Sequence, residues 1–279
     1  MRRSAVVQHP RGLEPHDHLC WTFDQYDEFH SRAGEFLREG LSHGQQVWYV
    51  AAGEPQTLAG HLRHVDGWDA AVADRAARIV PLATAYASAP IVDPHAQVHA
   101  FAAAAGRARA AGFTGLRVAA DCTPLVATDR HAAAFARYEH LVDHLMTTQP
   151  ITGMCAYHRG RVAPRTLARL SCLHPNTNTP GGFRLFAGTD GAAALAGELD
   201  IATLTPLEDA LADADPRPVD GQLTIDATEV GFLDHTTLLR LADHAARHHA
   251  TLLLRTRWRG AARLVDLLEL SGVRVEVAA

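Results

Sequence analysis

The sequence contains no lysine: all 26 residues counted as lysine or arginine are arginine. A phosphate-binding loop of the GxxxxGK[ST] type needs a lysine, and so does Schiff-base catalysis. The loop after the apolar run at 46–50 reads AAGEP, so it also lacks the glycine-rich cradle of such a loop. We therefore do not expect nucleotide hydrolysis. It is nevertheless the only enzymatic activity that the sequence leaves as a hypothesis.

Several other features are absent. There is no basic run and no Cys/His finger spacing, and the net charge is −5, which argues against nucleic-acid and anionic-membrane partners. No stretch approaches the ~20 apolar residues of a membrane span, and the first residues lack the apolar core of a signal peptide. No GxSxG motif marks a nucleophile. The four cysteines form no CxxC pair, so we expect a reduced, cytoplasmic protein. Because these catalytic motifs are absent, we also expect that the protein is not an enzyme.

Upstream of the polar run HPNTNTPGG at 174–182, apolar strand-like segments alternate with helical patterns. This alternation predicts a largely parallel sheet covered by helices on both faces. We expect strands at 18–23, 46–50, 77–82, 115–121 and 151–157, and helices from a cap at Asp24 to Gly40, at 95–111 and at 128–146.

From residue 183 onward the chain forms a compact unit of roughly 100 residues, a common domain size. FRLFAG and AALAGELD predict a strand pair. A helix follows, with Thr205 as its cap and Pro206 at its first position. We then expect a strand at 223–226, a helix after Asp234, a strand at 251–255, a helix at 258–270 and a final strand, VRVEV.

This C-terminal unit resembles a STAS domain, the fold of bacterial anti-sigma factor antagonists. The resemblance rests on LAGELDIATLTPLEDAL, LTIDATEVGFLDHTTLLRLADHA and RLVDLLELSGV. In that family the corners after GELD and after FLDSSGL lie side by side and bind a partner, an anti-sigma factor that is a GHKL-type serine kinase. The resemblance implies partner-binding residues at Asp200, Asp234, His235, Thr236, Thr237, Leu239 and Arg240.

The family's phosphorylated serine falls on Thr236, while His235 and Thr237 replace its neighbouring serine and glycine. Helical spacing places Thr237 near the buried stripe of the helix and Thr236 on its wet face with Arg240. We therefore expect Thr236 to be the phosphorylation site, with the phosphate pairing with Arg240. Helix capping is the alternative role of Asp234 and the threonines. The unit ends without the family's last helix, so we expect an apolar face to be covered by the N-terminal unit or by a second subunit.

The N-terminal unit resembles a MEDS domain, a sensor module of bacterial regulators that respond to small organic compounds. The matching pieces are HLCWTF, FLREGLSHGQQVWYV, AAGFTGLRVAAD, ARYEHLVDHL, CAYHRG and LHP. MEDS domains look like degenerate relatives of RecA/KaiC-type ATPases. Residues on these pieces are candidate ligand contacts, each with a packing or hydrogen-bonding alternative: His18, Trp21, Arg117, Asp121, Tyr138, Glu139, Cys155, Tyr157 and His174.

Pockets in open parallel sheets form beyond the carboxyl ends of the strands, here near 23–24, 51–54, 121–122 and 157–159. Eighteen histidines also raise a metal hypothesis, with i,i+4 pairs at His95/His99 and His140/His144. Cys155 would lie near His18 if their strands are neighbours. Nothing has the fixed spacing of HExxH or of paired CxxC. We therefore expect no metal and no haem, and at most a small organic effector.

The sequence thus predicts an α/β protein with a RecA/KaiC-like parallel sheet sandwiched by helices, followed by a smaller STAS α/β domain. The expected parts are a tail at 1–15, a MEDS sensor domain at 16–176, a linker at 177–182 and a STAS domain at 183–279. Each half should fold alone. The predicted role is that of a signalling protein whose sensor controls an anti-sigma factor antagonist. The alternative is a haem-, metal- or ligand-binding sensor whose STAS domain docks to a different partner. A homodimer remains open.

Overall fold

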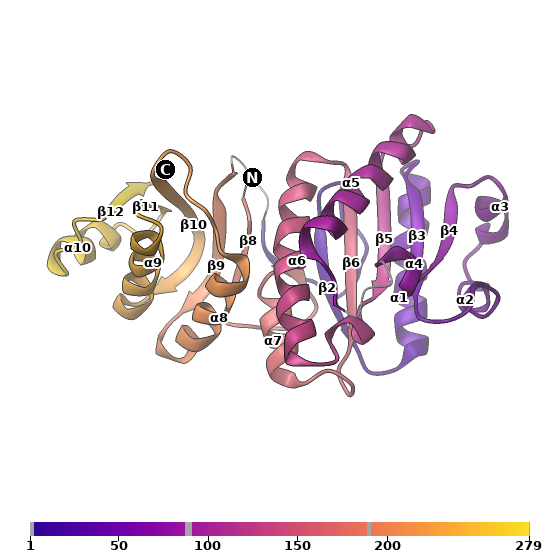
Figure 1. Ribbon diagram of the computed structural model, residues 1–279, viewed down its shortest axis with the longest axis horizontal. Helices are drawn as coiled ribbons and strands as arrows, with labels where there is room; N and C mark the ends of the chain where they lie inside the picture. Colours follow the sequence, from indigo (N-terminus) through magenta and orange to yellow (C-terminus); the bar gives the residue numbers. More distant parts are fainter. Residues whose placement is uncertain (1–2, 87–90, 189–190, 279) are drawn as a thin grey trace.

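The computed structural model describes residues 3–86, 91–188 and 191–278. It consists of two β-sheets with their helices, arranged one after the other along the long axis of the molecule (Figure 1). The first sheet has seven strands and the second has five. Among the described residues, none of the helices has both the length and the apolar character needed to cross a membrane.

The first sheet is entirely parallel, with strand order β1-β7-β2-β6-β5-β3-β4. Its inner strands are apolar and buried, as expected for a parallel sheet covered on both faces. The strands are β1 (Ala5–Val6), β2 (His18–Phe23), β3 (Gln46–Ala51), β4 (Ala77–Pro81), β5 (Leu116–Asp121), β6 (Ile151–His158) and β7 (Asn176–Thr177).

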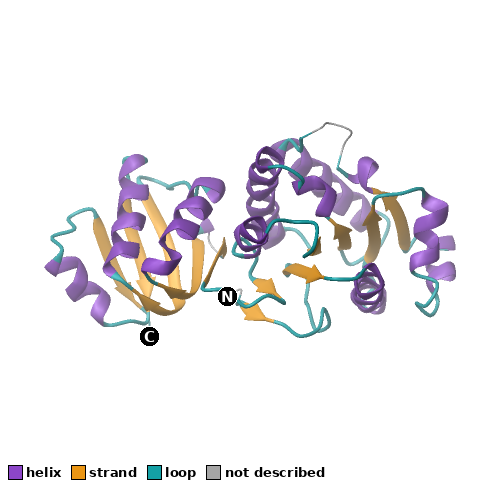
Figure 2. Ribbon diagram, turned by 90° about the horizontal axis from the view of Figure 1, so that it is seen from below, coloured by secondary structure: helices purple, strands orange, loops and turns teal. Residues whose placement is uncertain are grey.

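Helices cover both faces of this sheet (Figure 2). One face packs against α1 (Tyr26–Ser42), α2 (Pro55–His61) and α3 (Trp68–Ala73), through Phe29, Phe36 and Trp68 among others. The other packs against α5 (Pro94–Ala110) and α6 (Asp129–Thr148). Shorter helices are α4 (Leu82–Ala85), η1 (Thr123–Val126) and α7 (Pro164–Ser171).

The second sheet has the strand order β12-β11-β10-β9-β8. Its adjacent strands are parallel except for β8 and β9, which are antiparallel. Its apolar residues pack with those of three helices in one core. The elements are β8 (Phe183–Ala187), β9 (Ala193–Leu199), η3 (Ile201–Thr203), α8 (Leu204–Ala214), β10 (Gln222–Leu233), α9 (His235–Arg247), β11 (Thr251–Thr256), α10 (Gly260–Leu267) and β12 (Val273–Val277).

The edge strand β8 is covered by the first unit. The Leu185 N–H donates to the Cys172 carbonyl at 2.7 Å, and the Ala187 N–H donates to the Asp143 carboxylate at 2.7 Å. Phe183 and Leu185 belong to the same apolar cluster as α6, which lies beside β8 (Figure 1). The first unit therefore satisfies the free donors of a strand that would otherwise be an exposed edge.

The predicted strands and long helices are present, but several helix starts differ from the prediction. Asp24 does not cap α1, because the N-cap is Gln25 and has no side-chain cap bond. Thr205 lies inside α8, which begins at Leu204, and the capping box that precedes it is made by Asp200 and Thr203 on η3. The helix expected at 258–270 spans only Gly260–Leu267.

Short elements were not predicted, because a pair of residues carries no periodicity. β1 and β7 extend the first sheet beyond β2, on a side where the sequence analysis predicted no further strand. Within the segment expected to be a linker, Thr177 belongs to β7, and the Asn178 side chain accepts the Thr22 N–H at 2.8 Å. The chain is thus anchored to the first sheet just before it enters β8.

Candidate functional site

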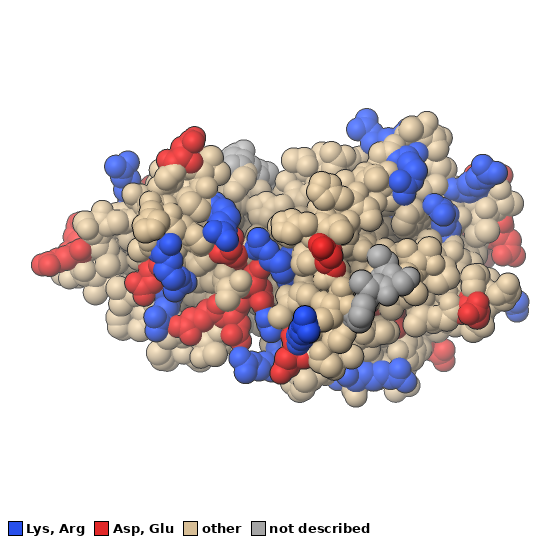
Figure 3. All heavy atoms as spheres, in the orientation of Figure 1, with Lys and Arg blue, Asp and Glu red and all other residues tan. Residues whose placement is uncertain are grey.

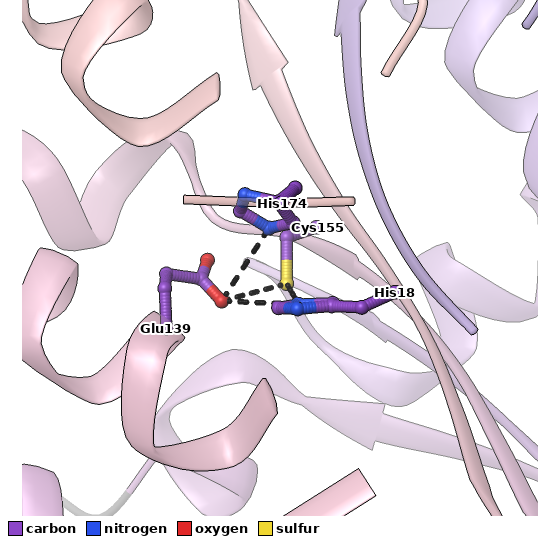
Figure 4. Close-up of side chains that lie close together, drawn as sticks. All are labelled: His18, Glu139, Cys155 and His174. Atoms are coloured by element: carbon purple, nitrogen blue, oxygen red, sulfur yellow. Dashed lines mark hydrogen bonds and ion pairs between the residues drawn. The ribbon is translucent and has the colours of Figure 1, made fainter. Parts of the chain in front are cut away.

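Four polar side chains from separate elements meet in the interior of the first unit (Figure 4). His18 begins β2, Cys155 lies on β6, Glu139 lies on α6, and His174 follows α7. We call these residues the buried quartet. β2 and β6 are parallel neighbours in which His18 pairs with Gly153. A Cβ at Gly153 would lie 2.7 Å from Met146 Cε and 3.3 Å from the His18 ring, so glycine leaves room for both side chains.

The ligand atoms of the buried quartet lie within 4.8 Å of one another. Glu139 Oε2 is 3.3 Å from His18 Nε2, 3.4 Å from Cys155 Sγ and 3.6 Å from His174 Nε2. Cys155 Sγ is 3.5 Å from His18 Nε2. All four residues are buried, so any charge among them is shielded from water.

A second layer of contacts orients the buried quartet. The Tyr157 hydroxyl donates to Glu139 Oε1 at 2.5 Å. His18 Nδ1 lies 3.2 Å from the Asp143 carboxylate, and His174 Nδ1 lies 2.9 Å from the Leu170 carbonyl. The other Asp143 oxygen accepts the Ala187 N–H of β8. One carboxylate therefore connects the buried quartet to the second sheet.

The neighbouring charges hold the two histidines in different states. Burial lowers the pKa of His18, but hydrogen bonds and attraction from Asp143 and Glu139 outweigh it and raise the value to about 9. Burial and the nearby His18 lower the pKa of His174 to about 4. Burial raises the pKa of Glu139, but His174 and His18 bring it below its usual value. The Cys155 pKa is raised by its hydrogen bond with Cys122 and by burial.

The structure brings five of the nine predicted ligand residues together, namely the buried quartet and Tyr157. Tyr138 packs beside them in an aromatic cluster with Tyr86 at 5.7 Å. Trp21 packs on the opposite face of the sheet, with α1. Six of the nine candidate ligand residues thus lie in or beside one interior cluster.

Arg117 and Asp121 have structural explanations instead. Arg117 is buried and donates to Glu39 at 3.0 Å, to Gln45 at 2.7 Å and to the Leu13 carbonyl at 2.6 Å. Asp121 accepts the Thr123 N–H at 3.1 Å, which stabilises the turn after β5. These contacts give both residues a hydrogen-bonding role within the fold.

Two residues near the site were not predicted. Asp143 lies four residues after Glu139 on α6, and this i,i+4 spacing is a signal that could have identified it. Arg184 on β8 carries no such signal, because only the meeting of the two units gives it its surroundings.

Arg184 lines a cavity of about 320 Å³ between the units, which we call the seam cavity. Residues of the first unit, including Thr22, Ser171 and Thr179, line one side, and Phe183 and Arg184 of the second line another. The Arg184 side chain is 5% exposed and donates to the Phe183 and Thr179 carbonyls at 2.7 and 3.0 Å. Its Nε has no hydrogen-bond partner, and no acidic group of the described residues contributes to its environment.

The residues predicted to bind a partner lie at the carboxyl ends of β9 and β10. The Asp234 N–H donates to the Leu199 carbonyl at 3.0 Å, so the corners after Leu199 and Leu233 are adjacent. Asp200 and His235 are exposed, and Leu239 is half-buried. The second unit thus presents both corners on one surface.

Asp234 caps α9, accepting the Thr237 N–H and the Thr236 hydroxyl at 2.8 Å each. Thr237 is fully buried, whereas Thr236 is half-buried. Arg240 pairs with Glu208 of α8 at 2.7 Å. It is one of several arginines that alternate with acidic side chains over α8, α9 and the adjoining part of α7 (Figure 3).

The protein thus consists of two α/β units, and the first of them encloses a buried polar cluster. The profile of the family described as MEDS, the MEthanogen/methylotroph, DcmR Sensory domain, matches residues 17–175. The chain belongs to this family of sensory domains. A comparison with curated proteins gave no significant match.

Proposed function

We propose that the protein is a signalling protein in which the MEDS domain binds a small organic effector and controls a C-terminal STAS domain. The STAS domain would bind an anti-sigma factor of the GHKL-type serine-kinase class. The protein would act by binding and not by catalysis. Membership of a sensory-domain family supports the sensor half of this proposal.

The observation that carries the proposal is the seam cavity. Both units line it, so a molecule bound there would contact both, and its binding would depend on their relative position. Its volume of about 320 Å³ suits a small organic molecule. An effector in this cavity would stabilise one arrangement of β8 against the first unit.

Arg184 indicates the chemical class of the effector. A buried guanidinium without an acidic partner is costly, because burial removes it from water with no compensating charge. Arginine pairs with carboxylates through charged N–H donors, and Arg184 lines the cavity. We therefore propose a small organic acid as the effector.

The coupling to the output surface would run through β8. β8 pairs with β9, and β9 ends at Leu199, directly before Asp200. The corner at Asp200 adjoins the corner at Asp234, where the family's partner binds. Movement of β8 would therefore shift one half of the proposed docking surface against the other.

The seam cavity can be tested by thermal unfolding of the full chain with a panel of small monocarboxylates, each paired with its uncharged amide. We expect at least one acid to raise the Tm of the wild type, its amide to have no effect, and Arg184→Gln to lose the response. Arg159→Gln serves as a control, because Arg159 also lines the cavity but pairs with Asp24 on the surface. Equal responses of acid and amide, or an unchanged response in Arg184→Gln, would contradict the proposal.

A further inference from the structure

We propose that the buried quartet of His18, Glu139, Cys155 and His174 is a binding site for a divalent transition-metal ion of the zinc type. The sequence led us to expect no metal, because nothing in it has the fixed spacing of HExxH or of paired CxxC. In the structure the four ligands come from four separate segments of the chain. The proposal rests on the geometry of the site and not on the effector or the partner.

Four of the six distances between the ligand atoms fit tetrahedral coordination, and the other two are below 4.8 Å. Zinc bonds of about 2.0–2.3 Å to N, O and S ligands give tetrahedron edges of about 3.3–3.8 Å. The edges from Glu139 Oε2 to the other three ligand atoms are 3.3, 3.4 and 3.6 Å. The edge from Cys155 Sγ to His18 Nε2 is 3.5 Å. Four edges of the buried quartet therefore have the length that one central ion requires.

Both imidazoles are oriented as metal ligands are. The Nδ1 atom of His18 faces the Asp143 carboxylate, and that of His174 faces the Leu170 carbonyl. An acceptor at Nδ1 keeps the proton there and turns the Nε2 lone pair toward the ligand. Both Nε2 atoms point into the buried quartet (Figure 4).

His174 shows that hydrogen bonds within the described residues do not complete the site. Its Nε2 is buried and has no hydrogen-bond partner. It lies 3.6 Å from Glu139 Oε2, so a lone pair faces a carboxylate oxygen when Nδ1 holds the proton. Two acceptors facing each other are unfavourable, and a cation between them would satisfy both.

The donor set selects the class of ion. Thiolate and imidazole ligands favour zinc and similar transition metals, whereas magnesium and calcium prefer oxygen ligands only. Metal binding would displace the proton of the Cys155 thiol and the Nε2 proton of His18. With Cys155 and Glu139 deprotonated and both histidines neutral, the ligands then carry two negative charges, which balance a divalent ion. All four ligands come from the protein and are buried, which is the arrangement of a closed, structural type of site.

The test uses the full chain, stripped with a chelating resin and then loaded with Zn²⁺ or Co²⁺ alone. We expect one tightly bound zinc per chain by elemental analysis, and a cobalt spectrum with a thiolate-to-metal charge-transfer band and strong d–d bands of tetrahedral coordination. Cys155→Ser should lose the charge-transfer band and bind zinc more than about 100-fold more weakly, and Asp143→Asn about 10–100-fold more weakly. Cys172→Ser is the matched control, because Cys172 is also buried but donates to the Arg169 carbonyl.

The thiolate band also separates the buried quartet from Asp215, His244 and His248, which gather within 4.8 Å of one another but include no cysteine. A second measurement does not depend on any variant: zinc should raise the Tm of the stripped wild-type protein, and a chelator should reverse the rise. Substoichiometric metal with no thermal shift would overturn the proposal. A charge-transfer band that survives in Cys155→Ser would overturn it as well.

Discussion

At the scale of single residues, Gly197 in the GELD segment has the clearest physical requirement. Its φ is +95°, and a Cβ there would lie 2.4 Å from the Gly182 carbonyl oxygen. The left-handed conformation costs other residues about 1–2 kcal/mol, and the contact with a backbone atom cannot relax by a side-chain movement. The glycine therefore allows β9 to approach the segment that enters β8.

We predict that Gly197→Ala lowers the free energy of unfolding by more than about 2 kcal/mol. Gly221→Ala is the control, because Gly221 also has a positive φ of +75° but open space around a Cβ. It should cost only the conformational term of about 1 kcal/mol. Urea denaturation of the two variants measures the difference, and equal losses would contradict the role of the backbone contact.

The two threonines at the start of α9 differ in accessibility. The Thr237 side chain is fully buried, and the half-buried Thr236 hydroxyl donates to Asp234. Thr236 is therefore the more accessible of the two threonines, whereas Thr237 would be exposed only if α9 moved away from the core. The Arg240 guanidinium expected to pair with a phosphate is held by Glu208, so that pairing needs the Arg240–Glu208 ion pair to open.

We predict that a GHKL-type anti-sigma kinase phosphorylates the wild type and Thr237→Ala, and that Thr236→Ala is not labelled. A phosphate at this position would lie at the positive end of α9 and beside Asp234, close enough to repel an acidic or apolar partner surface. Radiolabelling with the purified kinase is the measurement. Label that persists in Thr236→Ala and vanishes in Thr237→Ala would refute the assignment.

At the scale of elements, α7 and α8 are joined across the seam by two ion pairs that differ in burial. Arg169 donates to Asp213 through two N–H groups, one of them at 2.5 Å, and the Asp213 side chain is 7% exposed. Arg165 and Asp209 form a second pair at 2.8 Å, in which the arginine is 79% exposed. The same two helices thus provide a matched comparison.

Arg169→Gln should lower the free energy of unfolding by about 1–2 kcal/mol, because it leaves a buried carboxylate with weaker partners. The value lies at the lower end of the range for charged hydrogen bonds, since Arg169 keeps some contact with solvent. Arg165→Gln should cause little change, because exposed ion pairs are screened. Chemical denaturation of both variants decides the matter, and the account fails if Arg165→Gln has the larger effect.

The α1–α2 contact should respond to pH. The ring of His30 on α1 stacks on that of His61 on α2, with centroids 3.9 Å apart. Burial and the nearby His61 lower the pKa of His30 to about 4; His64 acts in the same direction and Asp27 opposes it. Below pH 6.5 the unfolded chain gains a proton at this histidine, while the folded protein does not until about pH 4.

The free energy of unfolding should therefore fall as the pH is lowered from about 6.5 to about 4. His30→Phe keeps a ring in the stack and removes this titration, so its stability should decline less over the same range. Urea titrations at several pH values compare the two proteins. Parallel pH profiles for wild type and variant would show that His30 contributes nothing to acid sensitivity.

The same elements show what the sequence could predict. Long apolar runs at 46–50 and 115–121 identified buried strands, because a parallel sheet leaves them no polar face. The alternation of side chains along a strand could also have shown which candidate residues lie on the same face of the sheet. His18 and Trp21 are three positions apart on β2, so their side chains lie on opposite faces, and only His18 faces Cys155.

Contacts between segments far apart in the sequence could not be predicted from such local patterns. The bond from Ala187 to Asp143, the burial of Arg184 and the approach of His174 to Glu139 each depend on how α6 and β8 meet. No local periodicity encodes that meeting. Sequence similarity identified all four members of the buried quartet as candidate ligand contacts, but only the fold shows that they meet at one point.

At the scale of the whole molecule, the two units share more than a chain connection. They have one continuous apolar cluster, hydrogen bonds from the first unit to the edge of β8, and ion pairs between α7 and α8. A change in the first unit therefore has a physical route to β8 and, through β9, to the corner at Asp200. We propose that this route couples the two units.

Hydrogen–deuterium exchange of the full chain, comparing wild type with Asp143→Asn, measures this coupling between the units. The variant weakens the bond that holds the Ala187 N–H, so the account predicts faster exchange in β8 and also at the corners of Asp200 and Asp234. Asp129→Asn, at the exposed start of α6, should leave these segments unchanged. Faster exchange confined to α6 and the adjoining strands of the first sheet would contradict the coupling.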